Sequence, residues 1–545
     1  MRLLLPATSS LLFGAAIAAF APARLSAQAH EHGPGEQLGR VTFAVSCTPE
    51  AQRRFERAMG LLHSFWWEQG VGAFRDVAAA DSTCAMAYWG TAMNAWGNPF
   101  GGGPSGPALA AAGQAAERAA AMGAGGKTPR ERGFISAVAT LYRDHGSVTN
   151  VQRLRAYSDT MARVYRDNPG DVEVAIYYAL SLVATAPPTD TTFTRQKQAA
   201  AILNPLFQRF PEHPGLAHYI IHANDSPRLA SLGLEAARRY AQIAPSAPHA
   251  QHMPSHIFIR LGLWEDDIAS NQRSYDAGVA YAKAQGLDGV LYHEFHALDY
   301  MVYGYLQLGQ DAAARRIAAR ADTQRQADAQ GPFITSYNRL ALAARVALER
   351  NDWAAAAKLP IPSAAPATLG AVTRFARGIG AARAGDTAQA RAEVAAMTEL
   401  ESAATTGPQG AYWSRVVGIK RRAVEAWLVF AKGDTARALA LAKDAADMED
   451  VTEKHPVTPG ELLPARELYG DLLLAARRYA EAREAYELTL LREPRRARAI
   501  FGAGQAAQLA GDQAGARKRY DEFLAQMKNG DGDRPEIARA RGGMR

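Results

Sequence analysis

Residues 470–494 read GDLLLAARRYAEAREAYELTLLREP, and residues 504–523 read GQAAQLAGDQAGARKRYDEF. In both stretches apolar residues recur at steps of three and four, the period of an amphipathic helix. Both also place a small residue, an alanine and an aromatic residue at the same intervals. These positions are Gly470, Ala482 and Tyr486, then Gly504, Ala516 and Tyr520. Pro494 closes the first stretch, and Phe523 adds a second aromatic residue to the second. The two stretches therefore predict a helical hairpin that is repeated along the chain.

A short phrase rich in small residues recurs at the expected turns between helices. It appears at 309–314 (GQDAAA), 351–356 (NDWAAA), 385–390 (GDTAQA), 433–438 (GDTARA), 477–482 (RRYAEA) and 511–516 (GDQAGA). Small residues allow two helices to cross closely, and glycine favours the left-handed conformation that ends a helix. The phrase indicates that hairpins continue through most of the chain.

This pattern resembles the tetratricopeptide repeat (TPR) family over residues 48–528, most clearly at the C-terminal end. The resemblance implies an all-α, right-handed superhelix of antiparallel helix pairs, a TPR-like α-solenoid. The chain is also similar to a group of exported bacterial TPR proteins that carry related phrases and have no established activity. Those phrases are CAMAYWG at 84–90, HMPSHI at 252–257 and HALDY at 296–300.

The 545 residues exceed the roughly 250–300 that one hydrophobic core supports, which also favours an elongated array of repeats. The clearest break is the Pro- and Ala-rich stretch LPIPSAAPATLG. The predicted parts are a signal peptide (1–27), a flexible leader (28–47), an N-terminal helical array (48–358), a linker (359–370), C-terminal repeats (371–528) and a loose tail (529–545).

The first residues have the form of a secretory signal. Arg2 precedes an apolar run from Leu3 to Phe20, and the small residues Ser26 and Ala27 follow. We therefore expect a periplasmic or secreted protein without a membrane anchor after cleavage; an uncleaved anchor is the alternative. Cleavage near residue 27 or 29 would bring His30 to or near the new N-terminus, where it could bind copper, or would leave a merely polar leader.

The charge and motif content argue against nucleic-acid and nucleotide ligands. Removal of the signal lowers the formal net charge of +7 to +5, and the basic residues are scattered over helix faces. The stretch AMGAGGKT at 121–128 lacks the glycine spacing and the preceding strand of a phosphate-binding loop. Thr128 and Glu131 instead form the pattern of a capping box.

Only two cysteines occur, Cys47 and Cys84, on either side of the first expected helix pair. In an oxidising compartment a disulfide between them is expected. The alternative is two buried thiols.

Eight of the thirteen histidines lie between residues 213 and 299. His218 and His222 form an H-x-x-x-H pair, and His252 and His256 form a second pair 34 residues later, which is the period of a TPR. Residues four apart on a helix have Cβ atoms about 5–6 Å apart, close enough to share a metal ion. Pro254 could begin a helix inside the second pair and disturb this geometry for His252.

The resemblance implies that both pairs line the concave groove, at the fifth and ninth positions of the first helix of their units. His296, Asp299 and Tyr303 fall at comparable positions of the next unit. The predicted metal ligands are His218, His222, His252, His256, His296 and Asp299, with His293 as a further candidate. Zn, Cu or Fe would suit such a set of imidazoles.

Other nearby groups are assigned lesser roles. Candidates for supporting or acid–base roles are Tyr219, Tyr292, Glu294 and Tyr300, while His63 and Glu68 would reach the site only if the superhelix curls back. His213 and His249 follow or precede prolines and are expected in turns. The alternatives to a metal site are histidines that contact a neighbouring helix or a peptide, or that act only in acid–base chemistry.

The sequence thus favours an exported TPR-type scaffold that binds a peptide or protein partner in its groove and carries a His/Asp transition-metal site. The alternatives are a metal-dependent hydrolase or oxidase and a periplasmic metal carrier.

Overall fold

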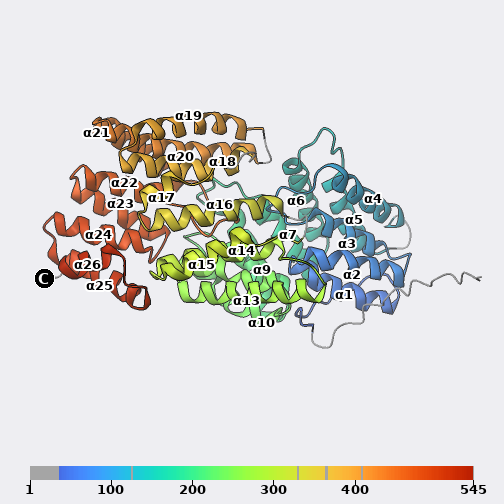
Figure 1. Cartoon of the computed structure of the whole chain (residues 1–545). Coiled ribbons are helices and arrows are strands. Elements are labelled where there is room, and N and C mark those ends of the chain that lie inside the picture. The colour runs from blue at the N-terminus through green and yellow to red at the C-terminus, as the bar shows by residue number, and fades with distance from the viewer. Residues whose placement is uncertain (1–35, 124–126, 328–330, 362–365, 407–408, 544–545) are drawn as a thin grey trace, which may run out of the picture. The chain divides into compact units, whose positions relative to one another are not determined.

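Helices joined by short turns account for nearly all of the regular structure, as the computed structural model shows for residues 36–123, 127–327, 331–361, 366–406 and 409–543 (Figure 1). Within these ranges the only β-type pairing is an isolated bridge between Val290 and Gln326. The helices of the first half are α1 (Pro49–His63), α2 (Trp67–Ala80), α3 (Ala85–Trp96), α4 (Gly106–Gly123), α5 (Pro129–Tyr142), α6 (Asn150–Asp167), α7 (Val172–Ala184), α8 (Thr194–Arg209), α9 (Pro214–Asn224), α10 (Ala230–Ile243), α11 (Pro248–His252), α12 (Pro254–Leu261) and α13 (Trp264–Ala284). Those of the second half are α14 (Tyr292–Gln307), α15 (Asp311–Thr323), α16 (Pro332–Glu349), α17 (Trp353–Ala357), α18 (Ala367–Ala384), α19 (Thr387–Ala404), α20 (Gly410–Ala431), α21 (Thr435–Asp450), α22 (Ala465–Ala475), α23 (Tyr479–Arg492), α24 (Ala497–Leu509), α25 (Gln513–Gln526), the 3₁₀ turn η1 (Met527–Asn529) and α26 (Pro535–Gly543).

The Gly-Asp dipeptides of the recurring phrase form the turns between paired helices. Gly385, Gly433 and Gly511 have φ values of +87°, +93° and +85°, a conformation that glycine adopts without strain. The aspartate that follows each glycine caps the next helix; Asp386, for example, accepts a hydrogen bond from the Gln389 N–H at 2.9 Å. The same two residues therefore end one helix and begin its partner.

The ring of Tyr486 packs between helices of neighbouring hairpins, at a repeat position that the sequence analysis identified. A Cβ atom on Gly470 would lie 3.0 Å from the ring of Tyr486, and one on Gly502 would lie 2.5 Å from it. The ring of Tyr486 on α23 therefore fits only because α22 and α24 present glycines to it. Gly504 and Tyr520 have the same relationship one unit later.

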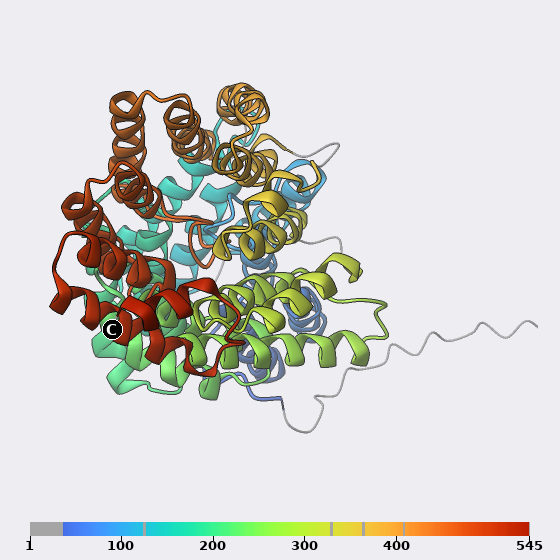
Figure 2. The same cartoon turned by 60° about the vertical axis from the view of Figure 1, so that its left-hand side comes forward.

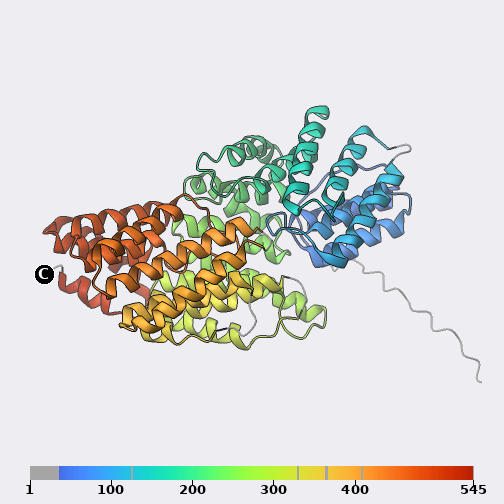
Figure 3. The same ribbon diagram turned by 90° about the horizontal axis from the view of Figure 1, so that it is seen from above.

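Successive hairpins stack through their first helices. In the second half, α14, α16, α18, α20, α22 and α24 each contact the next of this series, and each also contacts its own hairpin partner. Figure 3 shows the helices between residues 366 and 526 side by side, coloured orange to red. The predicted all-α, TPR-like solenoid is confirmed.

Residues 37–545 form one compact unit. The two predicted arrays contact each other inside this unit: the Arg495 guanidinium donates to the Gly262 carbonyl at 2.8 Å, and the Trp264 indole N–H donates to the Arg495 carbonyl at 3.1 Å. Figure 2 shows the C-terminal helices (red) and the α13–α15 region (green) from a second direction. The predicted signal peptide and His30 lie outside the described residues.

The structure differs from the sequence prediction at three boundaries. Residues 37–47 are not a loose leader, because Phe43 is fully buried against Phe55 and Trp89. The tail contains α26, which buries Ile537 and Ala540. Inside the expected linker, α18 already begins at Ala367, and residues 362–365 lie outside the described residues. Buried apolar side chains, such as Phe43 in the first segment and Ile537 in the tail, explain the first two differences.

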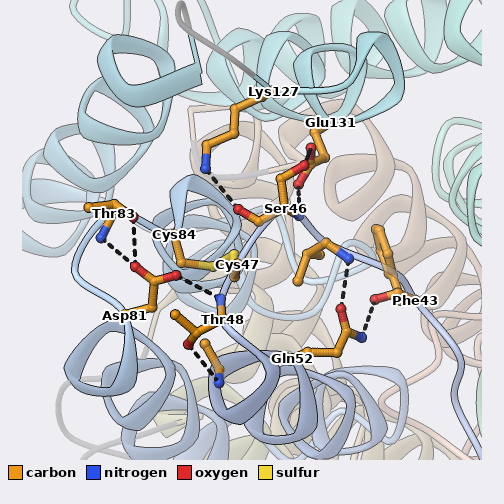
Figure 4. The surroundings of a disulfide bond; sticks show 12 residues. Phe43, Ser46, Cys47, Thr48, Gln52, Asp81, Thr83, Cys84, Lys127 and Glu131 are labelled. Carbon is orange, nitrogen blue, oxygen red and sulfur yellow. Dashed lines mark hydrogen bonds between the residues drawn. A yellow bond between two sulfur atoms is a disulfide. The ribbon is translucent and has the colours of Figure 1, made fainter.

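The predicted disulfide joins Cys47 to Cys84, whose Cα atoms are 5.1 Å apart, beside the start of α1 and of α3 (Figure 4). Hydrogen bonds hold the chain on both sides of it. The Thr48 N–H donates to Asp81 at 2.9 Å, and the Lys127 ammonium donates to the Ser46 carbonyl at 2.9 Å. The disulfide thus ties the N-terminal segment to the first two hairpins.

Among the helices of the described residues, none combines the length and the apolar character that a membrane crossing requires.

Candidate metal centre

A first group of three imidazoles meets between α9 and α11. His218 and His222, one turn apart on α9, have their Nε2 atoms 3.1 Å from each other. His249, in the first turn of α11, brings its Nε2 atom to 3.2 Å from that of His218. All three nitrogens lie within 4.8 Å of one another. We call His218, His222 and His249 the first triad.

The backbone fixes which nitrogen of His218 carries a proton. Its Nδ1 atom lies 2.6 Å from the carbonyl oxygen of His63, an acceptor, so Nδ1 must be the donor. In a neutral ring Nε2 then carries a lone pair. Two other ring nitrogens, from His222 and His249, approach this single lone pair, and one lone pair cannot accept two well-directed hydrogen bonds.

A second group of three imidazoles lies beside the first. His252 at the end of α11 and His256 on α12 have Nε2 atoms 3.1 Å apart, and His296 of α14 completes a set of nitrogens within 4.8 Å. We call His252, His256 and His296 the second triad. Ring centroids of the two triads are as close as 6.0 Å (His249 to His252).

Both Nδ1 atoms of the close pair in the second triad also face acceptors. His252 Nδ1 lies 2.6 Å from Asn271 Oδ1, and the Asn271 amide nitrogen is turned away because it donates to Asp267. His256 Nδ1 lies 2.8 Å from the carboxylate of Asp225. The two Nε2 atoms that face each other at 3.1 Å are therefore both lone-pair acceptors when the rings are neutral.

Pro254 divides this stretch without separating the histidines. It begins α12, as the sequence allowed, but Met253 keeps a helical backbone (φ −54°, ψ −34°) between α11 and α12. The four-residue relationship of His252 and His256 is therefore preserved. The proline only removes a backbone N–H, which the start of a helix does not need.

Burial favours the neutral form of these rings. It lowers the pKa of His218 to about 3, although the hydrogen bond to the His63 carbonyl opposes the shift. Burial, followed by the neighbouring imidazoles, also holds the pKa of His222 and of His249 well below the usual range. Burial is also the main cause that lowers the pKa values of His252, His256 and His296. Neutral imidazole is the form that binds metal ions.

Tyr300 is the nearest hydroxyl to the second triad. Its oxygen lies 3.3 Å from His256 Nε2 and also 3.3 Å and 3.4 Å from the carbonyl oxygens of Pro456 and Thr458. Burial raises its pKa well above the usual value, so the phenol stays protonated. Its single proton can be donated to one of the two carbonyls or to the lone pair of His256 Nε2.

A third cluster, His63, Glu173 and His213, is held together by hydrogen bonds between its own side chains, although His213 Nδ1 is buried without a partner. The Glu173 carboxylate accepts hydrogen bonds from Nε2 of His63 at 3.0 Å and of His213 at 2.9 Å, and the Tyr219 hydroxyl lies 3.1 Å from His63 Nδ1. Burial alone would raise the pKa of Glu173, but the two histidines lower it to about 2. The cluster holds the His63 carbonyl that orients His218.

Asp299, predicted as a metal ligand, is used elsewhere. Its carboxylate pairs with the Arg345 guanidinium at 3.0 Å and 3.3 Å, and neither side chain is exposed. It belongs to neither triad, so the sequence prediction is wrong for this residue. The reason is an arginine supplied by α16, which register alone did not reveal.

His293 lies next to the centre but outside both triads. Its ring centroid is 6.0 Å from that of His249, and its Nε2 atom is 3.7 Å from the carboxylate of Glu68. Tyr292 stacks on His293 at 3.8 Å. Glu294 is buried on the same helix, and burial raises its pKa to about 7.

Sequence reasoning missed His249 and undervalued His63. His249 was expected in a turn, yet α11 begins at Pro248 and carries it towards α9. Its position 31 residues after His218, close to one repeat period, was the available signal. His63 reaches α9 because α1 packs against that helix.

A non-helical segment of the chain itself covers one side of the second triad. Between α21 and α22, the carbonyls of Pro456 and Thr458 face Tyr300, and Arg345 donates to the carbonyls of Gly460 and Glu461. The sequence analysis predicted a peptide partner in the concave groove. Near Tyr300 and Arg345, residues 456–461 of the chain itself occupy the place expected for such a partner.

The proteins found to be similar to this chain are solved structures with low sequence identity to it. No protein-family model matches the chain, and no curated protein matches it. Among solved structures, yeast Tom70 is 9% identical and covers 91% of this chain and 88% of its own, with a TM-score of 0.27. The APC/C hetero-tetramer Cut9–Hcn1 is 11% identical, with coverages of 90% and 90% and a TM-score of 0.32. Naa15/Naa10 bound to HypK-THB is 10% identical, with coverages of 91% and 73% and a TM-score of 0.22. TM-scores of this size support no inference about function.

Proposed function

We propose that this chain is an exported metalloprotein in which each histidine triad binds a transition-metal ion. The observation that carries the proposal is the pair of acceptor nitrogens of His252 and His256 at 3.1 Å. A hydrogen bond between them would require a doubly protonated ring, which burial disfavours. A cation between them removes the repulsion of the two lone pairs.

The spacing of the nitrogens also suits a shared ion. Two imidazole nitrogens at 2.0–2.1 Å from a tetrahedral ion lie about 3.3 Å apart. The separations of His218 from His222 and His249, and of His252 from His256, are 3.1 Å, 3.2 Å and 3.1 Å, and all nitrogens of a triad lie within 4.8 Å of one another. Each triad supplies three imidazoles, a donor set that suits Zn, Cu or Fe. In the first triad the second nitrogen of His218 is held by a carbonyl, and in the second triad those of His252 and His256 are held by an amide and a carboxylate, as is usual for metal-binding imidazoles.

Three protein ligands leave one coordination position for an external molecule. A bound ion would act there as a Lewis acid or, for Cu or Fe, as a redox centre. With an ion on His256 Nε2, the Tyr300 hydroxyl 3.3 Å away could turn its proton from the carbonyls of Pro456 and Thr458 towards a molecule bound at that position. This favours a metal-dependent enzyme, a hydrolase or an oxidase, over a carrier, because the deeply buried His218 and His252 disfavour ready exchange of the ion.

A peptide- or protein-binding scaffold is the second candidate function. The TPR-like stacking of helices supports it. A partner on the inner wall near Tyr300 would have to displace residues 456–461, so binding would fall on another part of the surface. Export is supported by the Cys47–Cys84 disulfide, because disulfides persist in oxidising compartments.

The decisive experiment is elemental analysis of the full chain, expressed with its leader and purified without a histidine tag. We expect one ion for each triad. His222→Phe, which places a ring between Phe65 and Phe100, should remove the ion of the first triad, and His256→Phe that of the second. His145→Ala changes an exposed histidine and should leave the content unchanged.

A folded wild-type protein that contains no metal, and whose melting temperature does not respond to added Zn, Cu or Fe, would overturn the proposal. Equal metal loss in the His145→Ala control would also count against it, because the ions would then be bound at the surface.

A further inference from the structure

An apolar cavity lies behind the first triad. It has a volume of about 30 Å³, and its wall is formed almost entirely by carbon atoms from helices α1, α2, α3, α5, α6, α7 and α9, from Phe65 before α2 and from the segment after α3. Leu62, Trp96, Leu180 and Ala184 are among the residues that line it. None of the described histidines lines it.

One layer of aromatic rings separates this cavity from the metal-binding nitrogens. Phe65 and Tyr219 belong to the cavity wall, and the same rings contact His218, with centroid distances of 4.4 Å and 5.1 Å. Phe65 also stacks on His249 at 5.4 Å. A molecule in the cavity would therefore be one side chain away from the first triad.

The backbone of Phe65 is strained in the position that closes the cavity. Its φ is +51°, a region that a bulky side chain rarely adopts and that the surrounding packing must impose. The residue is nearly fully buried. The end of α1 sets this conformation: the Phe65 N–H donates to the Leu62 carbonyl at 3.1 Å and the Trp66 N–H donates to the Leu61 carbonyl at 3.0 Å, the hydrogen bonds of a left-handed helix end.

Size and chemistry restrict what the cavity can hold. A cavity needs about 10–15 Å³ on this measure to hold one water molecule, so 30 Å³ accommodates a molecule of two or three atoms. Tyr157 and Tyr177, whose buried hydroxyl groups have no hydrogen-bond partner, also line the cavity, but hardly any polar atom is exposed to the space itself. Apolar cavities of proteins stay dry and bind apolar atoms or molecules. Sugars, peptides and anions are too large or too polar.

We propose that the cavity binds a small apolar gas molecule of the dioxygen class and supplies it to the first triad past the ring of Phe65. Dioxygen is the member of this class that protein-bound Cu and Fe use. The supply step rests on the proposed metal site, whereas binding in the cavity does not.

Xenon tests the binding step on the full chain as purified, with or without metal. Crystals pressurised with xenon should show one xenon atom among Leu62, Trp96, Leu180 and Ala184. Ala184→Leu should fill the space and abolish that peak. Ala186→Leu, two residues further on and outside the wall, is the matched control and should keep it. Wild-type crystals with no xenon at this place, or with ordered water there, would overturn the proposal even if Ala184→Leu fails to fold.

Nitric oxide tests the supply step. In protein loaded with Fe(II), stopped-flow absorption should show binding of nitric oxide several-fold slower in Ala184→Leu than in wild type and Ala186→Leu. Equal rates in all three would refute supply through the cavity. If the protein takes up no iron while xenon still binds, the metal proposal fails and the gas-binding cavity stands.

Discussion

The Nε2 atoms of His252 and His256 face each other at 3.1 Å, although the Nδ1 atom of each ring already donates to an acceptor. The backbone places the two residues one helical turn apart, and Asn271 and Asp225 rotate both rings so that the remaining nitrogens converge. The orientation of the pair is thus set by residues that would never touch the ion.

Asn271 should control metal affinity through His252. Asn271→Leu removes the acceptor for His252 Nδ1 while keeping a similar side-chain volume. Loss of such an orienting hydrogen bond lowers affinity by about 10–100-fold. Competition with a chromophoric chelator measures it. Gln272→Ala, on the neighbouring position of α13, is the control; equal affinities in wild type and Asn271→Leu would contradict the role.

Asp299 should matter for stability and not for metal content. Asp299→Asn leaves the buried Arg345 guanidinium without its counter-charge, and breaking such a pair costs about 3–5 kcal/mol of unfolding free energy. Urea denaturation of the metal-free protein measures the loss, and elemental analysis should show an unchanged metal content. If Asp299→Asn contains one metal ion fewer than the wild type, Asp299 is a metal ligand after all.

The protein without metal should lose stability as the pH falls below about 6.5. The pKa values of the six triad histidines are lowered in the folded state, that of His218 to about 3, while the unfolded chain has ordinary values near 6.5. Between these values the unfolded state binds more protons, so each such group contributes stability at neutral pH that is lost on acidification, by up to about 1.4 kcal/mol per pH unit.

Melting temperatures from pH 7.5 to pH 4.5 measure this dependence. His222→Phe removes one titrating group and should flatten the curve, whereas His145→Ala should not. A melting temperature that rises on acidification would contradict the neutral, buried state of the triads.

Removal of the disulfide should destabilise the protein without abolishing the triads. Cys47 and Cys84 are separated by 37 residues, and closing a loop of that size stabilises a protein by typically about 2–4 kcal/mol. The double variant Cys47→Ser/Cys84→Ser should show this loss in chemical denaturation. Reductant should lower the stability of the wild type to the same value and leave the double variant unchanged; a reductant effect on the double variant would point to another cause.

Much of the fold could be predicted because its signals are local. The Gly-Asp turns, the helical period and the Gly470–Tyr486 spacing each lie within one hairpin, and each fixes a helix end or a close helix crossing. The pairing of Cys47 with Cys84 followed from a single hairpin between them. The segment 37–47 and the tail from residue 529 were judged wrongly because side chains in them, such as Phe43 and Ile537, are buried by packing against separate helices, which a local pattern does not reveal.

The sequence by itself determined that the chain is an array of helical hairpins and that His218/His222 and His252/His256 are pairs, because residues four apart on a helix share a face wherever that helix lies. Only the tertiary structure decided that His249 joins the first pair, that His296 joins the second and that Asp299 belongs to Arg345. Those outcomes depend on how α9, α11, α14 and α16 are offset against one another, and that offset is fixed by packing between helices rather than by the residues within any one of them.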